Sequence, residues 1–179
     1  MNCFAIKYAK KQEKTNLPVW LVLIASLLKT TRLGGECRGF YGGKMIKGRK
    51  RHIITDTMGL LLAVVVHAAN VHDSKGASDV IALLRGRFER LIKIVADGGY
   101  RGELIEKTKT KFGWVLEIVL RTDHSNKFTV IPQRWVVERT FAWFESYRRL
   151  SKDFEYLTDT SEAMIQFAML KLMLNRIKK

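Results

Sequence analysis

Two acidic residues occupy positions in which a carboxylate could do chemistry. Asp97 follows an apolar run at residues 91–96 and precedes two glycines, within the stretch IVADGGYRG. The run predicts a buried strand, and polar residues at the carboxyl ends of such strands face the crevice where α/β proteins bind ligands. Glu138 lies within VVERTFAWF, whose apolar residues have helical spacing, so it adjoins a buried face. Each residue has an ordinary alternative, since Asp97 could cap the following helix and Glu138 could form an ion pair with Arg134.

Taken together, the two carboxylates indicate metal-assisted chemistry on phosphate. Two divalent ions about 4 Å apart can activate an attacking oxygen and stabilise a leaving one. Mg²⁺ takes carboxylate oxygens, water and substrate phosphate as ligands, and Mn²⁺ accepts similar oxygen ligands. A strand-end Asp and a helix Glu can supply these ligands if the fold brings them together. The sequence therefore predicts a Mg²⁺ site at Asp97 and Glu138, with Mn²⁺ as an alternative ion.

The charge balance favours a polyanionic partner. Of 179 residues, 32 are Lys or Arg and 17 are Asp or Glu, which gives a net charge of +15. Nucleic acid is the commonest polyanion, although a merely soluble basic protein could share this composition. Residues 31–51 are rich in glycine and basic residues, which predicts a mobile basic loop. For the basic run KMIKGRKRH at residues 44–52, the alternative is the solvated edge of a strand. We expect DNA contacts at Lys44, Lys47, Arg49, Lys50, Arg51, His52 and Arg101.

The cysteines and the apolar runs argue against several classes of protein. Cys3 and Cys37 show neither metal-binding spacing nor a disulfide framework, as is typical of a reducing cytosol. The apolar run at residues 19–28 is shorter than the roughly 20 residues that a membrane span needs, and no clean signal-peptide cleavage site follows it. We therefore expect a cytoplasmic protein without a membrane segment. Residues 1–17 are expected to be a poorly ordered basic segment, and residues 18–179 to be one domain.

The elements that must position both carboxylates alternate along the chain. The apolar run at residues 18–28 predicts a buried strand or helix, counted here as the first strand, and residues 91–96 predict a buried strand. Further strands are predicted at residues 51–57, 60–69 and 113–121. The first two of these form a hairpin through a short turn. One helix follows a cap at Asp73 or Ser74, a second spans residues 134–150, and a third begins near Asp159, which has capping-box spacing to Glu162. This series predicts an α/β domain with a mixed sheet covered by helices.

Four segments, in this order, resemble one family. "GRKRHIITDTMGLLLAVVVHAANVHD", "IVADGGYRG", "RWVVERTFAWF" and "YRRLSKDFE…SEAMI" are similar to the catalytic domain of bacterial insertion-sequence transposases of the DDE class, over roughly residues 29–178. The resemblance implies an RNase H-like fold and three acidic residues that bind metal ions. It matches Asp97 to the second and Glu138 to the third. It also matches Arg134 to an arginine that contacts the DNA backbone and implies that Arg139 steadies phosphate.

The first acidic residue of the family pattern is missing. The pattern places it a few residues before Lys-Thr-Thr, where this chain has Ile24 or Ala25. Tyr41 also stands where relatives often carry an acid. Asp56 is the nearest acid in the next strand, and we expect the hairpin turn to hold it far from the site. About twenty unrelated residues replace the family's helical DNA-binding region, so the chain resembles the downstream part of a transposase gene.

Three functions remain open at this point. The first is a DDE transposase that cleaves and joins DNA with Mg²⁺, acting on transposon ends and target DNA as a homo-oligomer. The second is a DNA-binding remnant without chemistry, which the missing first acid favours and which would interfere with an intact transposase in a mixed oligomer. The third, an RNase H-like nuclease, is disfavoured by the GGYRG and VVERTFAW motifs. The first two predict DNA affinity that falls steeply with salt.

Overall fold

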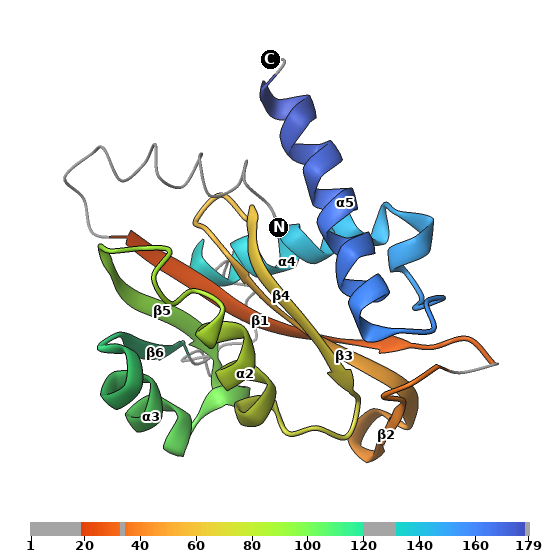
Figure 1. Ribbon diagram of the computed structural model, residues 1–179, viewed down its shortest axis with the longest axis horizontal. Helices are drawn as coiled ribbons and strands as arrows, with labels where there is room; N and C mark the ends of the chain where they lie inside the picture. Colours follow the sequence, from red (N-terminus) through yellow and green to blue (C-terminus); the bar gives the residue numbers. More distant parts are fainter. Residues whose placement is uncertain (1–18, 33–34, 120–131, 178–179) are drawn as a thin grey trace, which may run out of the picture.

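The protein folds around one mixed sheet of six strands (Figure 1). The computed structural model describes residues 19–32, 35–119 and 132–177, so the expected segment 1–17 lies outside the described residues. The strands are β1 (Val19–Lys29), β2 (Gly39–Tyr41), β3 (Ile46–Thr55), β4 (Leu61–Ala68), β5 (Leu91–Asp97) and β6 (Val115–Val119). The helices are α2 (Asp73–Ala82), α3 (Glu103–Phe112), α4 (Pro132–Glu145) and α5 (Thr158–Ile177), with short 3-10 turns η1 (Gly42–Lys44), η2 (Gly98–Tyr100) and η3 (Arg148–Leu150).

The central strand of the sheet is β1. It pairs antiparallel with β3 on one side and parallel with β5 on the other, and β5 pairs parallel with β6. Both β4 and the short β2 pair antiparallel with the far edge of β3. The middle of β1 is apolar and almost fully buried from Leu21 to Ile24, as a strand covered on both faces requires. The sheet therefore brings the carboxyl end of β5 beside the middle of β1.

Helices cover both faces of the sheet, and β3 shows which helix lies on which face. Successive side chains of a strand point to opposite faces. His52 points toward α2, where a Cβ added at Gly76 would lie 2.4 Å from its ring. Arg51 points the other way, with its guanidinium 5.0 Å from the centre of the Phe144 ring on α4. Figure 1 shows α2 in front of the sheet and α4 behind it.

Most predicted elements are confirmed, including the β3–β4 hairpin, β5, β6 and helices α2, α4 and α5. One prediction was wrong for residues 46–50, which form the first half of β3 rather than part of a mobile loop. The predicted cap of α2 was also wrong. His72 caps this helix, and its Nδ1 accepts a hydrogen bond from the Ser74 N–H at 3.3 Å.

The start of α5 also differs from the predicted capping box. The helix begins at Thr158, and Asp159 lies within its first turn. The Glu162 side chain reaches across to the sheet instead, where Oε1 accepts a hydrogen bond from the Val66 N–H of β4 at 2.8 Å. Across the described ranges, no helix combines the length and the apolar character that crossing a membrane would take.

Candidate active site

Asp97 is the last residue of β5 and is exposed at the carboxyl end of that strand. Its Oδ1 accepts a hydrogen bond from the Gly99 N–H at 3.0 Å, so the carboxylate caps the η2 turn. The capping alternative therefore holds for this short turn, whereas α3 follows Gly102 and has no side-chain cap. An exposed carboxylate at the end of a parallel strand also lies where α/β proteins place ligand-binding groups.

The register of the sheet identifies the residue beside Asp97. Leu23 pairs with Ala96 in the parallel ladder of β1 and β5, so Ile24 is the next position and lies level with Asp97. Level positions in adjacent strands point to the same face. Ala25 pairs with His52 and belongs to the opposite face. Of the two candidates for the missing acid, Ile24 has the required place, and its apolar side chain is 3% exposed.

Glu138 lies on α4, the helix that covers the face of Ile24 and Arg51, and its side chain is exposed. The side chain of Arg134 lies outside the described residues, so neither its ion pair nor its DNA contact is tested. Within the described ranges, no group of three or more His, Cys, Asp and Glu side chains is arranged to hold a metal ion. Asp56 does not fill the gap, because its Oδ1 accepts hydrogen bonds from the N–H groups of Met58 and Leu60 in the hairpin turn.

A carboxylate that the sequence analysis treated only as a helix cap lies beside Asp97. A Cβ built on Gly99 would lie 3.2 Å from Asp97 Oδ1 and 3.3 Å from Asp73 Oδ2. The two oxygens therefore lie within about 6.5 Å of each other, the sum of those distances. Because Gly99 has no side chain, both carboxylates can approach its backbone. The only sequence signal for Asp73 was its place at the start of a helix.

The buried side chains of Lys50 and His52 contact one oxygen of Asp73. Lys50 Nζ lies 2.8 Å from Asp73 Oδ1, and His52 Nε2 lies 3.6 Å from the same oxygen. Lys50 also donates a hydrogen bond to the Val71 carbonyl oxygen at 2.9 Å. His52 and Lys50 lower the pKa of Asp73 to about 2, against the burial that raises it. Asp73 is therefore ionised at neutral pH.

Tyr100 completes the surroundings of the two carboxylates. Its side chain is 1% exposed, and its hydroxyl has no hydrogen-bond partner in the described part of the chain. Its ring centre lies 6.1 Å from that of His52, the residue that adjoins Asp73. Burial raises the pKa of Tyr100, and the charges of Asp73 and Asp97 add to this effect. The hydroxyl is therefore protonated and is available as a donor.

The basic segment from residue 44 to residue 52 divides into an exposed and a buried half. Lys44 and Lys47 are exposed, as is Arg101 after η2. Arg139 is half-buried over the Trp143 ring, 5.2 Å from its centre. The predicted DNA contacts in the buried half are between 0 and 5% exposed, namely Arg49, Lys50, Arg51 and His52.

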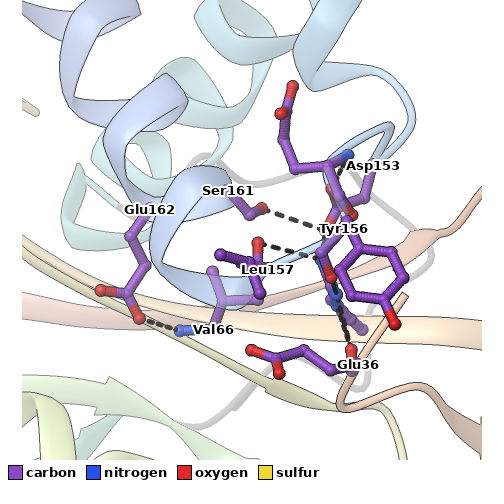
Figure 2. A network of polar contacts seen from close by, with 9 residues as sticks. Glu36, Val66, Asp153, Tyr156, Leu157, Ser161 and Glu162 are labelled. Carbon is purple, nitrogen blue, oxygen red and sulfur yellow. Dashed lines mark hydrogen bonds and ion pairs between the residues drawn. The ribbon is translucent and has the colours of Figure 1, made fainter.

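The buried half is engaged inside the protein. Arg49 donates to Asp153 Oδ2 at 3.0 Å and to the carbonyl oxygens of Glu36 and Tyr156. Figure 2 shows the residues gathered around this network, in which Ser161 also donates to Asp153 Oδ2 at 3.0 Å. Arg51 donates to the Leu150 carbonyl oxygen at 3.2 Å, and burial lowers its pKa to about 10. These side chains hold the sheet to the segments around it and are not placed at the surface.

Whether this region can bind a divalent ion depends on which carboxylate ligands it offers. The three-carboxylate pattern of the resemblance does not fit, because an apolar residue occupies position 24. Two carboxylates at one glycine do fit, since Mg²⁺ is commonly bound by one or two carboxylates with water and substrate phosphate as further ligands. The space that a Cβ of Gly99 would fill lies within 3.3 Å of a carboxylate oxygen of both Asp73 and Asp97.

Comparison with known proteins agrees with this fold. The chain is 33% identical over 142 residues to the transposase of insertion sequence element IS402 from Burkholderia cepacia, which covers 74% of this chain. The match spans 65% of that relative, less than two thirds of its length. The catalytic core domain of BIV integrase is similar in structure, with a TM-score of 0.50 and 14% identity, over 86% of this chain and 82% of that one.

A second solved structure extends the comparison. A chain of the simian T-cell lymphotropic virus intasome, in complex with PP2A regulatory subunit B56 gamma, has a TM-score of 0.52 and 12% identity, over 83% of this chain and 46% of that one. These likenesses confirm the predicted RNase H-like α/β fold. The model of the transposase DDE domain matches residues 25–173, a range that begins directly after Ile24 and includes Asp97 and Glu138. The chain therefore belongs to the transposase DDE domain family.

Proposed function

We propose that this chain acts on DNA as a transposase, cleaving and joining strands during transposition of an insertion sequence. The observation that carries the proposal is the place of Asp97 within the part of the chain that matches the family. This carboxylate is exposed at the carboxyl end of β5, beside the central strand. Family membership supports the reaction class, and the end of β5 supports Asp97 as the residue where the reaction occurs.

Asp97 and Glu138 are the residues proposed to hold Mg²⁺, or Mn²⁺ in its place. A divalent ion bound there would stabilise negative charge on the attacking and leaving oxygens of a phosphodiester. The Gly99 N–H holds one oxygen of Asp97, which limits the orientations of the carboxylate. Exposed basic side chains would contact the DNA phosphates by charge-assisted hydrogen bonds. We propose this role for Lys44, Lys47, Arg101, Arg134 and Arg139.

Double-stranded DNA, as transposon ends and as target, is the proposed partner. The net charge of +15 supports binding to a polyanion. One similar solved structure belongs to an intasome, and we propose that this chain works as a homo-oligomer on DNA. The proposed place of action is the bacterial cytoplasm, at the nucleoid.

A second candidate function is DNA binding without strand chemistry. The observation that favours it is Ile24, which lies level with Asp97, is buried, and cannot bind a metal ion. A chain with this defect could still occupy DNA, or join an intact transposase in a mixed oligomer and lower its activity.

The test is cleavage and strand transfer on duplex DNA that carries the element's ends, with Mg²⁺ or Mn²⁺. The unmodified chain is compared with Ile24→Asp and with the matched control Ala25→Asp. Because Ile24 points to the same face as Asp97 and Ala25 to the other, only Ile24→Asp is expected to raise activity. Asp97→Asn and Glu138→Gln are expected to abolish it, and circular dichroism checks that each variant folds.

Each outcome separates the two candidates. Activity in the unmodified chain that is lost in Asp97→Asn supports the enzyme. Activity only in Ile24→Asp supports the DNA-binding protein for this chain, on a scaffold that still accepts the missing carboxylate. Activity that survives both Asp97→Asn and Glu138→Gln would show that the reaction takes place elsewhere.

A further inference from the structure

We propose that Asp73 and Asp97 together hold a divalent cation beside Gly99, with Asp73 reaching the ion from the α2 face of the sheet rather than from the face of position 24. The inference rests on the proposed function, because it takes Asp97 as a metal-binding residue. It adds a ligand from α2, an element to which the family resemblance assigned no metal-binding residue. It also bears on which of the two candidate functions this chain performs.

Two carboxylate oxygens approach the same point beside Gly99. Asp97 Oδ1 and Asp73 Oδ2 lie 3.2 and 3.3 Å from the point where a Cβ of Gly99 would be. Two oxygens that bind one Mg²⁺ at about 2.1 Å each lie roughly 3–4 Å apart. The present separation is below about 6.5 Å, and the exposed Asp97 side chain would close the difference by rotating and exchanging its hydrogen bond with the Gly99 N–H for the ion.

Lys50 and His52 fix the orientation of the Asp73 carboxylate. Its Oδ1 is engaged by Lys50 and lies near His52, whereas its Oδ2 faces Gly99. Lys50 is itself fixed by the Val71 carbonyl oxygen and lies over the Tyr41 ring, 4.9 Å from its centre. Metal-binding carboxylates are commonly held in this way by hydrogen-bonding neighbours that fix their direction. One oxygen is thus anchored, and the other is directed toward Asp97.

The Tyr100 hydroxyl is a hydrogen-bond donor near the same two carboxylates. Tyr100 is almost fully buried, and within the described residues its hydroxyl has no hydrogen-bond partner. A buried polar atom of this kind requires an explanation, such as a bound water or ion. Both Asp73 and Asp97 act electrostatically on this hydroxyl, so it lies within reach of their charges. A hydrated cation between the carboxylates would bring a water that could accept its proton in a hydrogen bond.

The local charge also favours a cation beside Gly99. Asp73 and Asp97 carry two negative charges, and Lys50 neutralises one of them through its contact with Asp73. The remaining negative charge faces the open end of β5, where Asp97 is exposed. A divalent cation would offset this charge, and DNA phosphate and water would complete its ligands.

The experiment measures Mn²⁺ binding to the full chain, without DNA, from the loss of the free-ion electron paramagnetic resonance signal. Asp73→Asn and Asp97→Asn are each expected to weaken binding by at least about tenfold, as loss of even an outer partner of a metal site does. The matched control is Asp79→Asn, which removes an exposed carboxylate from the same helix. Its affinity for Mn²⁺ is expected to stay within about twofold of the unmodified chain.

Two results would overturn the inference in distinguishable ways. If Asp97→Asn weakens binding and Asp73→Asn does not, Asp73 is not a ligand, while Asp97 keeps its proposed role. If neither change has an effect, the inference fails together with the proposed metal site at Asp97.

A measurement on the unmodified chain covers the case in which Asp73→Asn fails to fold. Titration with diamagnetic Mg²⁺, followed by the side-chain carboxyl ¹³C signals of the unmodified chain, reports on each carboxylate separately. Changes at both Asp73 and Asp97 over the same Mg²⁺ concentrations support the inference. A change at Asp97 alone would contradict it.

Discussion

At the scale of single residues, Arg49 shows how burial decides what a basic side chain can do. Its guanidinium is 1% exposed and donates to the Asp153 carboxylate and to main-chain carbonyl oxygens. We expect Arg49→Met to lower the free energy of unfolding by about 3–5 kcal/mol, because it leaves the Asp153 carboxylate buried without its cation. Urea unfolding followed by circular dichroism measures this change.

The control for Arg49 is an ion pair on the surface. Lys107 lies 2.8 Å from Glu103 on α3, with a side chain that is 60% exposed. Lys107→Met is expected to change stability by less than about 0.5 kcal/mol, as exposed helix pairs of this spacing do. If Arg49→Met left stability unchanged but weakened DNA binding, Arg49 would be a DNA contact after all, as its sequence neighbourhood first indicated.

At the scale of elements, the contact between α5 and β4 should make stability depend on pH. Glu162 accepts the Val66 N–H of β4, and burial raises its pKa above the ordinary value of 4.5. The folded protein therefore binds this proton more tightly than the unfolded chain. The contribution of Glu162 to stability falls as pH rises from about 4.5 through the raised pKa. Glu162→Gln, which keeps an acceptor for Val66, should thus be more stable than the unmodified protein at pH 7.

The Glu162 prediction is checked by unfolding both proteins in urea at pH 4 and pH 7. The gain at pH 7 should stay below about 1 kcal/mol, because solvent reaches part of the side chain. It should shrink or reverse at pH 4, where Glu162 is protonated. Glu106→Gln, an exposed change on α3, is the control and should show little pH-dependent difference. An equal gain at both pH values would rule out Glu162 ionisation as the cause.

The elements also show which parts of the fold were predictable. β5 and the hairpin were predicted correctly because a buried strand is a run of apolar residues, which is visible in the local sequence. The first half of β3 was missed because the partners of its basic residues lie far along the chain, Asp153 being 104 residues from Arg49. No local sequence pattern reveals such a contact. The glycine and basic residues therefore predicted a loop, although contacts with distant residues stabilise a strand here.

The candidate site was predictable to the same extent and for the same reason. Asp97 was found from the apolar strand before it, and Glu138 from the helix around it. The choice between Ile24 and Ala25 needed the register of β1 with β5, which only the sheet supplies. Asp73 was missed because its approach to Gly99 depends on where α2 begins relative to η2.

At the scale of the whole molecule, the net charge of +15 predicts DNA binding that depends on salt and on where the exposed charges lie. The logarithm of the affinity for duplex DNA should fall linearly with the logarithm of the salt concentration, with a slope of about −0.9 for each phosphate neutralised. If Lys44 and Lys47 each contact a phosphate, the double change to Gln should make the slope less negative by about 1.8. Fluorescence anisotropy between 50 and 200 mM salt measures both slopes.

The matched control removes the same charge elsewhere. Arg85 and Arg87 follow the end of α2, about 15 Å along that helix from Asp73 at its start. Changing both to Gln lowers the net charge equally and should leave the slope nearly unchanged. If the two double variants reduced the slope alike, binding would follow the total charge rather than a defined surface. Lys44 and Lys47 would then have no special role in binding, because a diffuse field falls off within about 10 Å at these salt concentrations and cannot set a register on DNA.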